Sequence, residues 1–295
     1  MMLPMILMLL FWRIPAQAGY VTEIAPYLIK SKTFYQDITR DGKPDKIRLK
    51  VITDEAYGES VEKVKVYVNG KNAGTIQYEA YSNCGIKVYY IYMSQNREFL
   101  QICEASGNDY VGTNELYSYQ ASTGKLKKVC TFPREAMNIR NVVSASSSRI
   151  QVLVTGQPTE TGWIQGELTY VYKNGKFQLK SNVLPVKSLF YKNGDISSDQ
   201  YAAYLNRNQY VVANKRAFYT TTGMKKKAFT AKRGDVLTLK KMKISGKKVY
   251  LQFQKGSKTG WQRVFRNNVY DYSISDWDEI AKTGWFYGIY QRLAG

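Results

Sequence analysis

Apolar and polar residues alternate with a period of two over most of this chain, which is typical of β-strands with one buried face. The clearest case is the run 63–68, where three valines alternate with two lysines and a tyrosine ahead of Asn69-Gly70. Asn-Gly is preferred in two-residue hairpin turns, because both positions need a positive φ. This stretch therefore predicts a β-hairpin.

Similar strand-like runs follow at short intervals, with turns between them. They cover residues 46–51, 86–93, 99–103, 116–119, 126–130, 150–154, 168–172, 177–179, 210–213, 218–219, 236–239 and 249–253. This spacing favours an antiparallel sandwich or propeller-like fold over βαβ units, so we predict a mainly β protein. A Tyr-x-Tyr pair before a Gly-Lys turn occurs at Tyr117 and again at Tyr170, which indicates similar hairpins without a clean repeat.

The strand pattern weakens between Asn182 and Gly194, where Pro185 and Asn193-Gly194 predict turns. The 295 residues suffice for about two domains. We therefore predict a β domain over residues 19–185 and a second module over 195–295. Helical spacing of apolar residues predicts a short helix over Ser198 to Asn206.

Residues 1–18 have the pattern of a secretory signal peptide: an apolar run over 3–12, then Pro15, then Ala16-Gln17-Ala18 as a cleavage site. The run is about half as long as a membrane-spanning helix requires. No Lys or Arg precedes the run, which leaves open a start further upstream. We expect a secreted, envelope-associated protein without a transmembrane span after cleavage; the alternative is a short membrane anchor.

The chain is strongly basic, with 43 Lys and Arg, 23 Asp and Glu, and a net charge of +20. Residues 186–295 hold 21 basic and 7 acidic residues, a difference of +14, whereas residues 19–185 hold 21 and 16, a difference of +5. Basic surfaces attract polyanions. For a secreted protein, the expected partners are anionic cell-wall polymers such as teichoic acid, peptidoglycan, acidic polysaccharide or anionic lipid, and not chromosomal DNA.

Lysine groups in the second module are the candidate anion-binding residues. They are Lys225, Lys226 and Lys227, and Lys247 and Lys248, with Lys240, Lys241 and Lys243 nearby. An alternative is that these lysines keep edge strands from pairing with other chains. Aromatic residues lie among them, which also fits a single-stranded nucleic-acid binder.

The absence of histidine restricts the enzymatic alternatives. It leaves out Ser-His and Cys-His nucleophiles and HExxH zinc sites. A carboxylate pair of glycosidase type or a Ser-Lys dyad remains, and the densest acidic cluster is Asp276, Asp278 and Glu279. Because these acids more simply charge the start of a short helix, we predict a non-enzyme, with a glycan hydrolase as the alternative.

The stretch from Asp37 to Asp45 has the oxygen spacing of a calcium-binding loop. Ligands at its first, third, fifth and ninth positions, with a carbonyl at the seventh, would be Asp37, Thr39, Asp41, Asp45 and Lys43. Gly42 allows the sharp turn, whereas neutral Thr39 and cationic Arg40 depart from the pattern. Arg48 at the twelfth position excludes an EF-hand, and the alternative is an Asp-Gly turn with solvated carboxylates.

Over residues 35–49 this stretch resembles the FG-GAP and VCBS-like loops of extracellular propeller and adhesin repeats. The resemblance implies calcium as a structural staple of a β domain, not as a catalyst.

A second resemblance covers residues 210–264. Gly234-Asp235 precedes an apolar strand, a basic hairpin follows, and Gly260-Trp261 leads to Val264, an arrangement similar to bacterial SH3-like domains. The resemblance implies a small β-barrel that binds cell-wall peptides or glycans in an aromatic groove, with Tyr219, Tyr250 and Trp261 as candidates. Trp261 is equally compatible with the core, and a core position is less expected for Trp285 in the aromatic tail.

Three cysteines, Cys84, Cys103 and Cys130, are an odd number for an oxidising compartment. Cys103 and Cys130 both end strand-like runs and are candidates for a disulfide. The alternative is that all three are buried thiols.

Overall fold

The computed structural model describes residues 19–26, 28–54, 60–77, 86–104, 113–133, 137–188, 201–264 and 284–289. Antiparallel β-sheets make up most of these residues, with one short helix, so the prediction of a mainly β fold is confirmed. The residues of the predicted signal peptide, Cys84 and the cluster of Asp276, Asp278 and Glu279 lie outside the described ranges. No helix in the described part of the chain is long and apolar enough to cross a membrane.

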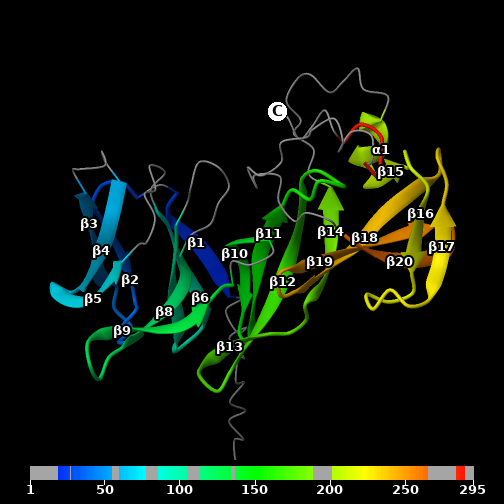
Figure 1. Ribbon diagram of the computed structural model, residues 1–295. Coiled ribbons are helices and arrows are strands. Elements are labelled where there is room, and N and C mark those ends of the chain that lie inside the picture. The colour runs from blue at the N-terminus through cyan, green and yellow to red at the C-terminus, as the bar shows by residue number, and fades with distance from the viewer. Residues whose placement is uncertain are drawn as a thin grey trace, which may run out of the picture.

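The first part of the chain forms three successive four-stranded meanders, in which each strand pairs with the next (Figure 1). The first meander holds β2 (Lys32–Gln36), β3 (Asp45–Asp54), β4 (Ser60–Val68) and β5 (Lys71–Gln77). The second holds β6 (Ile86–Ser94), β7 (Arg97–Glu104), β8 (Asn114–Gln120) and β9 (Lys125–Thr131), and β1 (Tyr20–Ala25) pairs with β6 at its edge. The third holds β10 (Asn138–Ser146), β11 (Arg149–Gly156), β12 (Ile164–Lys173) and β13 (Lys176–Leu179).

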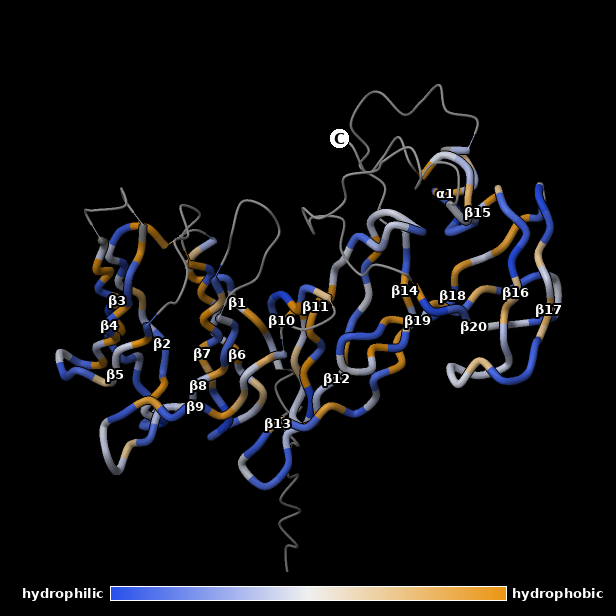
Figure 2. Tube along the Cα trace, viewed as in Figure 1, coloured by the Kyte–Doolittle hydropathy of each residue, from blue (hydrophilic) through white to orange (hydrophobic). Residues whose placement is uncertain are grey.

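The second meander is buried on both faces. One apolar core joins it to the first meander, and a second core runs from it through the third meander into the C-terminal strands. Tyr89, Tyr90 and Ile91 on β6 are therefore all buried in succession. A strand covered on both sides reads as a continuous apolar run rather than an alternating one. In Figure 2 the hydrophobic positions concentrate on these inner strands, and the β4–β5 and β12–β13 turns are hydrophilic.

The meanders share a turn between their third and fourth strands. Gly70, Gly124 and Gly175 occupy these turns with φ of 81°, 67° and 76°, and a lysine follows each of them. The two Tyr-x-Tyr pairs lie on β8 and β12, the third strands of the second and third meanders. The recurring motif thus marks the same hairpin of successive meanders.

A buried polar network joins the second meander to the third. Gln101 Nε2 donates to Asn114 Oδ1 at 2.8 Å, and Gln101 Oε1 accepts from the backbone N–H of Val142 at 2.8 Å. Asn114 Nδ2 donates to the carbonyl of Arg140 at 2.7 Å. These side chains thus bond backbone groups of β10 at the point where its register with β11 shifts, between Ile139 and Val142.

The C-terminal strands continue the sheet of the third meander. They are β14 (Val183–Ser188), β15 (Gln209–Val211), β16 (Arg216–Tyr219), β17 (Lys227–Ala231), β18 (Val236–Ser245), β19 (Lys248–Lys255) and β20 (Lys258–Arg263). Pairing runs in the order β14-β18-β19-β20-β16-β17, and β15 pairs with the first part of β18. Among the described strands this pairing does not close into a ring. Helix α1 (Ala202–Asn206) lies within the predicted stretch Ser198 to Asn206, of which residues 198–200 are outside the described ranges.

Strand β14 lies at the expected domain boundary and bonds to both sides. It pairs with β12 through Val186 to Ser188 and with β18 through Val183 to Pro185. One sheet therefore runs from the third meander into the C-terminal strands. Gly166 permits the close approach, since a Cβ there would lie 2.6 Å from the carbonyl oxygen of Pro185.

Trp285 belongs to the core, so the expectation of a more exposed side chain is wrong. Phe286 forms a β-bridge with Val212, and the backbone N–H of Ala213 donates to the carbonyl of Trp285 at 2.9 Å. The return of the chain to β15 leaves Trp285 only 4% exposed, in edge contact with Phe218. Pairing between segments so far apart in sequence is not visible in local composition.

Cys103 and Cys130 are free thiols, so the pairing considered for them is absent. Strand β8 separates their strands, β7 and β9. Burial raises the pKa of each thiol to about 12, as expected for the buried-thiol alternative.

Candidate functional site

Strands β16 to β20 present one face to the core and the other outward. On the outward face, register pairs join Lys241 to Gln252, Gln252 to Trp261, Trp261 to Tyr219, and Tyr219 to Lys227. Directly paired residues of antiparallel strands share a face. These five residues therefore form one row across five strands, from lysine to lysine.

A second row lies beside the first. Lys243 pairs with Tyr250, and Tyr250 pairs with Arg263, each two residues along its strand from a member of the first row. Side chains two residues apart on a strand point to the same side. We call the eight residues of both rows the Trp261 face: Lys227, Tyr219, Trp261, Gln252, Lys241, Lys243, Tyr250 and Arg263.

The other predicted lysines border this face. Lys225 and Lys226 belong to the loop between β16 and β17, which reaches back toward β18, since Lys243 Nζ donates to Thr222 Oγ1 at 3.0 Å. Lys247 and Lys248 are exposed at the β18–β19 turn, two strand positions beyond Lys243. The structure thus places all eight predicted ligand-binding residues on or beside one face. The sequence already grouped Lys241 and Lys243 with these lysines, whereas Gln252 and Arg263 were missed, because only the strand register puts them there.

Basic residues far outnumber acidic ones in the described stretch 201–264, which contains the Trp261 face. Residues 201–264 contain sixteen Lys and Arg, most of them exposed, and one acidic residue, Asp235. Asp235 accepts the backbone N–H of Lys232 at 2.6 Å and pairs with Lys255. These bonds, the backbone one first, lower the pKa of Asp235. The one carboxylate of this region is therefore already engaged.

The aromatic members of the face offer little open ring surface. Trp261 is only 9% exposed, and Tyr219 and Tyr250 are half-buried. The lysines and Arg263 at the ends of the rows protrude further. The arrangement is accordingly better suited to charge contacts than to stacking in an aromatic groove.

The predicted calcium loop joins β2 to β3. Asp37 Oδ1 accepts the backbone N–H groups of Arg40 and Asp41 at 2.7 and 3.1 Å, and Asp37 Oδ2 accepts that of Gly42 at 3.0 Å. Positive φ angles at Arg40 (70°) and Gly42 (81°) curl the backbone around this carboxylate. Gly42 thus makes the sharp turn expected at the sixth position.

Asp45 anchors the other end of this loop. It is 2% exposed, and Oδ2 accepts the backbone N–H groups of Ile38 and Thr39 at 2.8 and 2.7 Å. Oδ1 accepts Thr39 Oγ1 at 3.0 Å and Asn69 Nδ2 at 2.6 Å. Calcium would therefore have to compete with donors of the protein for these oxygens.

Asp41 also bonds within the loop, its Oδ1 accepting the backbone N–H of Lys43 at 2.8 Å. In the part of the chain that the structure describes, no three His, Cys, Asp or Glu residues converge as metal ligands. Calcium binding at Asp37, Thr39, Asp41, Lys43 and Asp45 stays a prediction.

Arg40 turns away from the loop interior toward the second meander. Its Nε lies 2.9 Å from Oε2 of Glu98 on β7, and Glu98 is 4% exposed. Burial raises the pKa of Glu98 and outweighs the lowering effect of Arg40. The cation that departs from the calcium pattern is thus the partner of a buried carboxylate.

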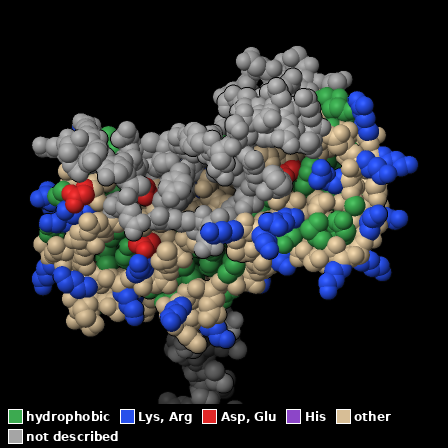
Figure 3. Space-filling view, viewed as in Figure 1, with side chains coloured by type: hydrophobic (Ala, Val, Ile, Leu, Met, Phe, Trp, Pro, Cys, Tyr) green, Lys and Arg blue, Asp and Glu red, His purple; other side chains and the backbone are tan. Residues whose placement is uncertain are grey.

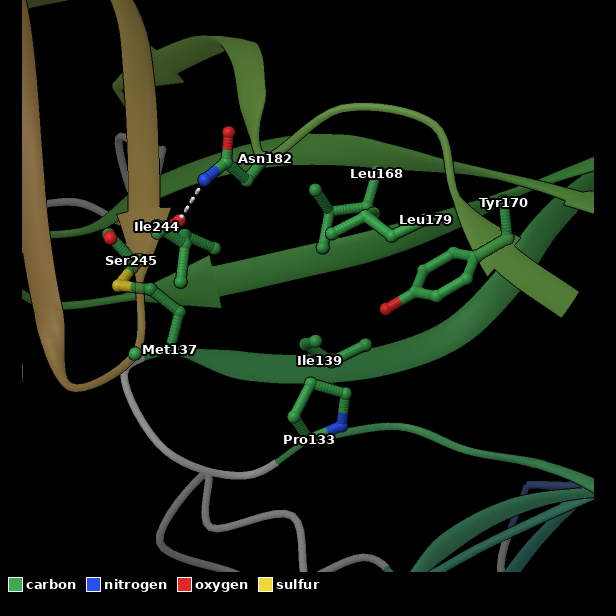
Figure 4. Close-up of a pocket in the computed structure, with 10 residues that line it drawn as sticks. Pro133, Met137, Ile139, Leu168, Tyr170, Leu179, Asn182, Ile244 and Ser245 are labelled. Carbon is green, nitrogen blue, oxygen red and sulfur yellow. Dashed lines mark hydrogen bonds between the residues drawn. The ribbon is translucent and has the colours of Figure 1, made fainter.

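An apolar pocket of about 330 Å³ lies between the third meander and the β18–β19 turn (Figure 4). Its polar side chains are Tyr170, Asn182 and Ser245, and Asn182 Nδ2 donates to the carbonyl of Ile244 at 2.9 Å. The lining residues are Pro133, Met137, Ile139, Leu168, Tyr170, Leu179, Asn182, Ile244, Ser245 and Gly246. None of these described lining residues carries a carboxylate, the group that a glycosidase uses as acid and base.

Comparison with family models finds no match to this chain, and searches of the curated proteins and of the solved structures find none either.

Proposed function

We propose that this is a secreted, non-catalytic protein of the bacterial cell exterior, held to an anionic cell-wall or matrix polymer by the Trp261 face. The observation that carries the proposal is the charge of residues 201–264, where sixteen basic residues stand against one engaged carboxylate. Such a surface attracts polyanions, because few negative charges on it oppose their approach. In this proposal the C-terminal strands act as an SH3-like binding module, and the calcium loop acts as a staple of the first meander.

Protection of sheet edges does not account for Lys241 and Lys243 on β18, although Lys227 lies on the edge strand β17. Lys241 pairs with Pro185 on one side and Gln252 on the other, and Lys243 likewise has a partner on both strands beside it. Charges that block aggregation are needed on edge strands. Central lysines therefore favour the binding interpretation.

Binding should be led by charge, because Trp261 is largely covered. The polymer would contact the ammonium and guanidinium groups first, with the half-buried tyrosines beside them. Attraction between exposed charges is screened over about 8 Å at physiological ionic strength. Attachment should accordingly weaken steeply as salt is added.

The test is a salt-series pull-down on cell-wall sacculi with and without teichoic acid. We expect retention only where teichoic acid is present, and release at modest salt. The variant Lys227→Gln/Lys241→Gln/Lys243→Gln/Arg263→Gln should lose retention. The control Lys127→Gln/Lys173→Gln/Lys176→Gln/Lys180→Gln, which removes the same charge from exposed lysines of the second and third meanders, should keep most of it.

Other outcomes would overturn the proposal. Salt-resistant retention on bare sacculi would indicate a groove that reads peptide or glycan. Strong oligonucleotide binding at physiological salt without retention on sacculi would indicate a nucleic-acid binder. Release of reducing sugar would establish a glycan hydrolase.

A further inference from the structure

The outward face of the first meander is also basic. Lys46, Arg48 and Lys50 alternate along β3 with buried Ile47 and Leu49. Lys63 and Lys65 alternate along β4 with the buried valines Val64 and Val66. The apolar side packs on the second meander, so the basic side points away from the rest of the molecule.

Register brings these cations together. Lys50 pairs directly with Lys65, and Arg48 pairs with Tyr67 on β4. Tyr35, which is 60% exposed, pairs with Lys46 from β2. We call this set the Lys50 face: Lys46, Arg48, Lys50, Lys63, Lys65, Tyr35 and Tyr67.

Among the described side chains, one carboxylate forms an ion pair with the Lys50 face. Glu62 lies 2.6 Å from Lys63, and the acids of the loop 37–45 lie beyond its Lys46 end. Within the described ranges, Lys46, Arg48, Lys50 and Lys65 make no ion pair with a carboxylate. Like charges in direct register, as at Lys50 and Lys65, destabilise a sheet.

Edge protection again fails as an explanation. Both β3 and β4 are central strands, with β2 and β5 at the edges of this sheet. The edge strands need charges to prevent aggregation, but the central ones do not. Placing Lys50 opposite Lys65 therefore costs stability without protecting an edge of this sheet.

We propose that the Lys50 face is a second polyanion-binding surface, which takes a separate segment of anionic wall or matrix polymer. In Figures 1 and 3 the first meander and the strands of the Trp261 face lie at opposite ends of the molecule, and basic side chains project at both ends. Two surfaces so placed let one molecule bridge two polymer segments. Bridging rests on the proposed function of the Trp261 face, whereas binding by the Lys50 face does not.

Avidity follows if both surfaces engage one long polymer. The second contact is then intramolecular, and overall binding exceeds that of either face without any new contact. With separate chains, the same geometry cross-links them. A short anion can occupy each face independently, so the number of anions bound per protein molecule gives the number of binding faces.

The test is isothermal titration of the full chain with short linear polyphosphate at low salt. The wild type should bind two equivalents. The variant Lys46→Gln/Arg48→Gln/Lys50→Gln/Lys65→Gln should bind one, as should the fourfold Trp261-face variant given above. The control variant on the second and third meanders should keep two, and a melting curve should show each variant folded.

Cross-linking is read separately by light scattering with purified teichoic acid. The wild type should form large assemblies, and either fourfold variant should form none. Two equivalents retained by the Lys50-face variant would overturn this inference. Loss of all binding in that variant, with none lost in the Trp261-face variant, would instead overturn the proposed function. A preference of the Lys50 face for single-stranded oligonucleotide over teichoic acid at physiological salt would overturn the polymer assignment.

Discussion

Arg40 Nε lies 2.9 Å from Oε2 of Glu98, and this ion pair ties the loop between β2 and β3 to the next meander. Glu98 is buried, whereas the Arg40 side chain is 30% exposed. Arg40 thus provides a positive charge beside a carboxylate that is largely shielded from water. Pairs of this kind stabilise little as a whole but are costly to break from one side.

Arg40→Gln should therefore destabilise the protein at neutral pH by about 1–3 kcal/mol, the typical cost of a buried acceptor left unsatisfied. Lys43→Gln, with the same charge change in the same loop, should have little effect. Urea unfolding measures both, and equal losses in the two variants would argue against the pair.

The same substitution has a pH signature. Burial raises the pKa of Glu98 in the folded protein, so folding is favoured by protonation and disfavoured as pH rises through that pKa. Without Arg40 the pKa should rise further. The destabilisation caused by Arg40→Gln should thus be largest at neutral pH and fade on acidification, as unfolding curves across pH would show.

Trp261 and Tyr250 should respond differently to truncation. Trp261→Ala removes a side chain that is 9% exposed, and should cost about 3–5 kcal/mol of stability. Tyr250→Ala removes a half-buried side chain and should cost less while weakening polymer binding. Melting curves measure the loss of stability, and retention on teichoic-acid-bearing sacculi measures the loss of binding. A Trp261→Ala variant that is only slightly destabilised but fails to bind would favour the aromatic-groove interpretation.

Cys103 and Cys130 should resist alkylation in the folded protein. With pKa values raised to about 12, thiolate at pH 8 is only about one part in ten thousand at each site. Iodoacetamide followed by peptide mass spectrometry should find both unmodified until denaturant is added. Rapid labelling of Cys103 in the folded state would contradict its buried position.

Calcium should raise the melting temperature of the wild type but not of Asp41→Ala. A ligand at a hundred times its Kd stabilises the folded state by about 2.7 kcal/mol. Asp41 suits this test because it is exposed and its side chain bonds locally, accepting the backbone N–H of Lys43. No calcium heat by titration, together with unchanged melting of both proteins, would leave the loop as a turn closed by its own carboxylates.

Local patterns were sufficient for much of the strand assignment. The Asn69-Gly70 and Asn174-Gly175 turns and the strands beside them follow from turn chemistry and alternation. Strands β2 and β10 were less evident: β2 is short, and the register of β10 shifts twice. The stacking of the meanders was not predictable, because it depends on which apolar faces meet.

The candidate faces depend on register more than on composition. Lysine density pointed to Lys225 to Lys227, but the row through Trp261 arises only when four register pairs are known. The Lys50 face was not evident from the net charge of residues 19–185, because acidic residues elsewhere in that part offset its basic residues. A shift of one residue would send either set of cations to the opposite side of its sheet.

Strand β14 connects the third meander to the C-terminal strands and would carry any force applied between them. Three register pairs join it to β12 and three others join it to β18, so tension between the two basic ends passes through this short segment. Each of those two contacts is smaller than the eight-pair contact between β11 and β12. A molecule stretched between two polymer chains would therefore load β14 along its whole length, its first half against β18 and its second half against β12.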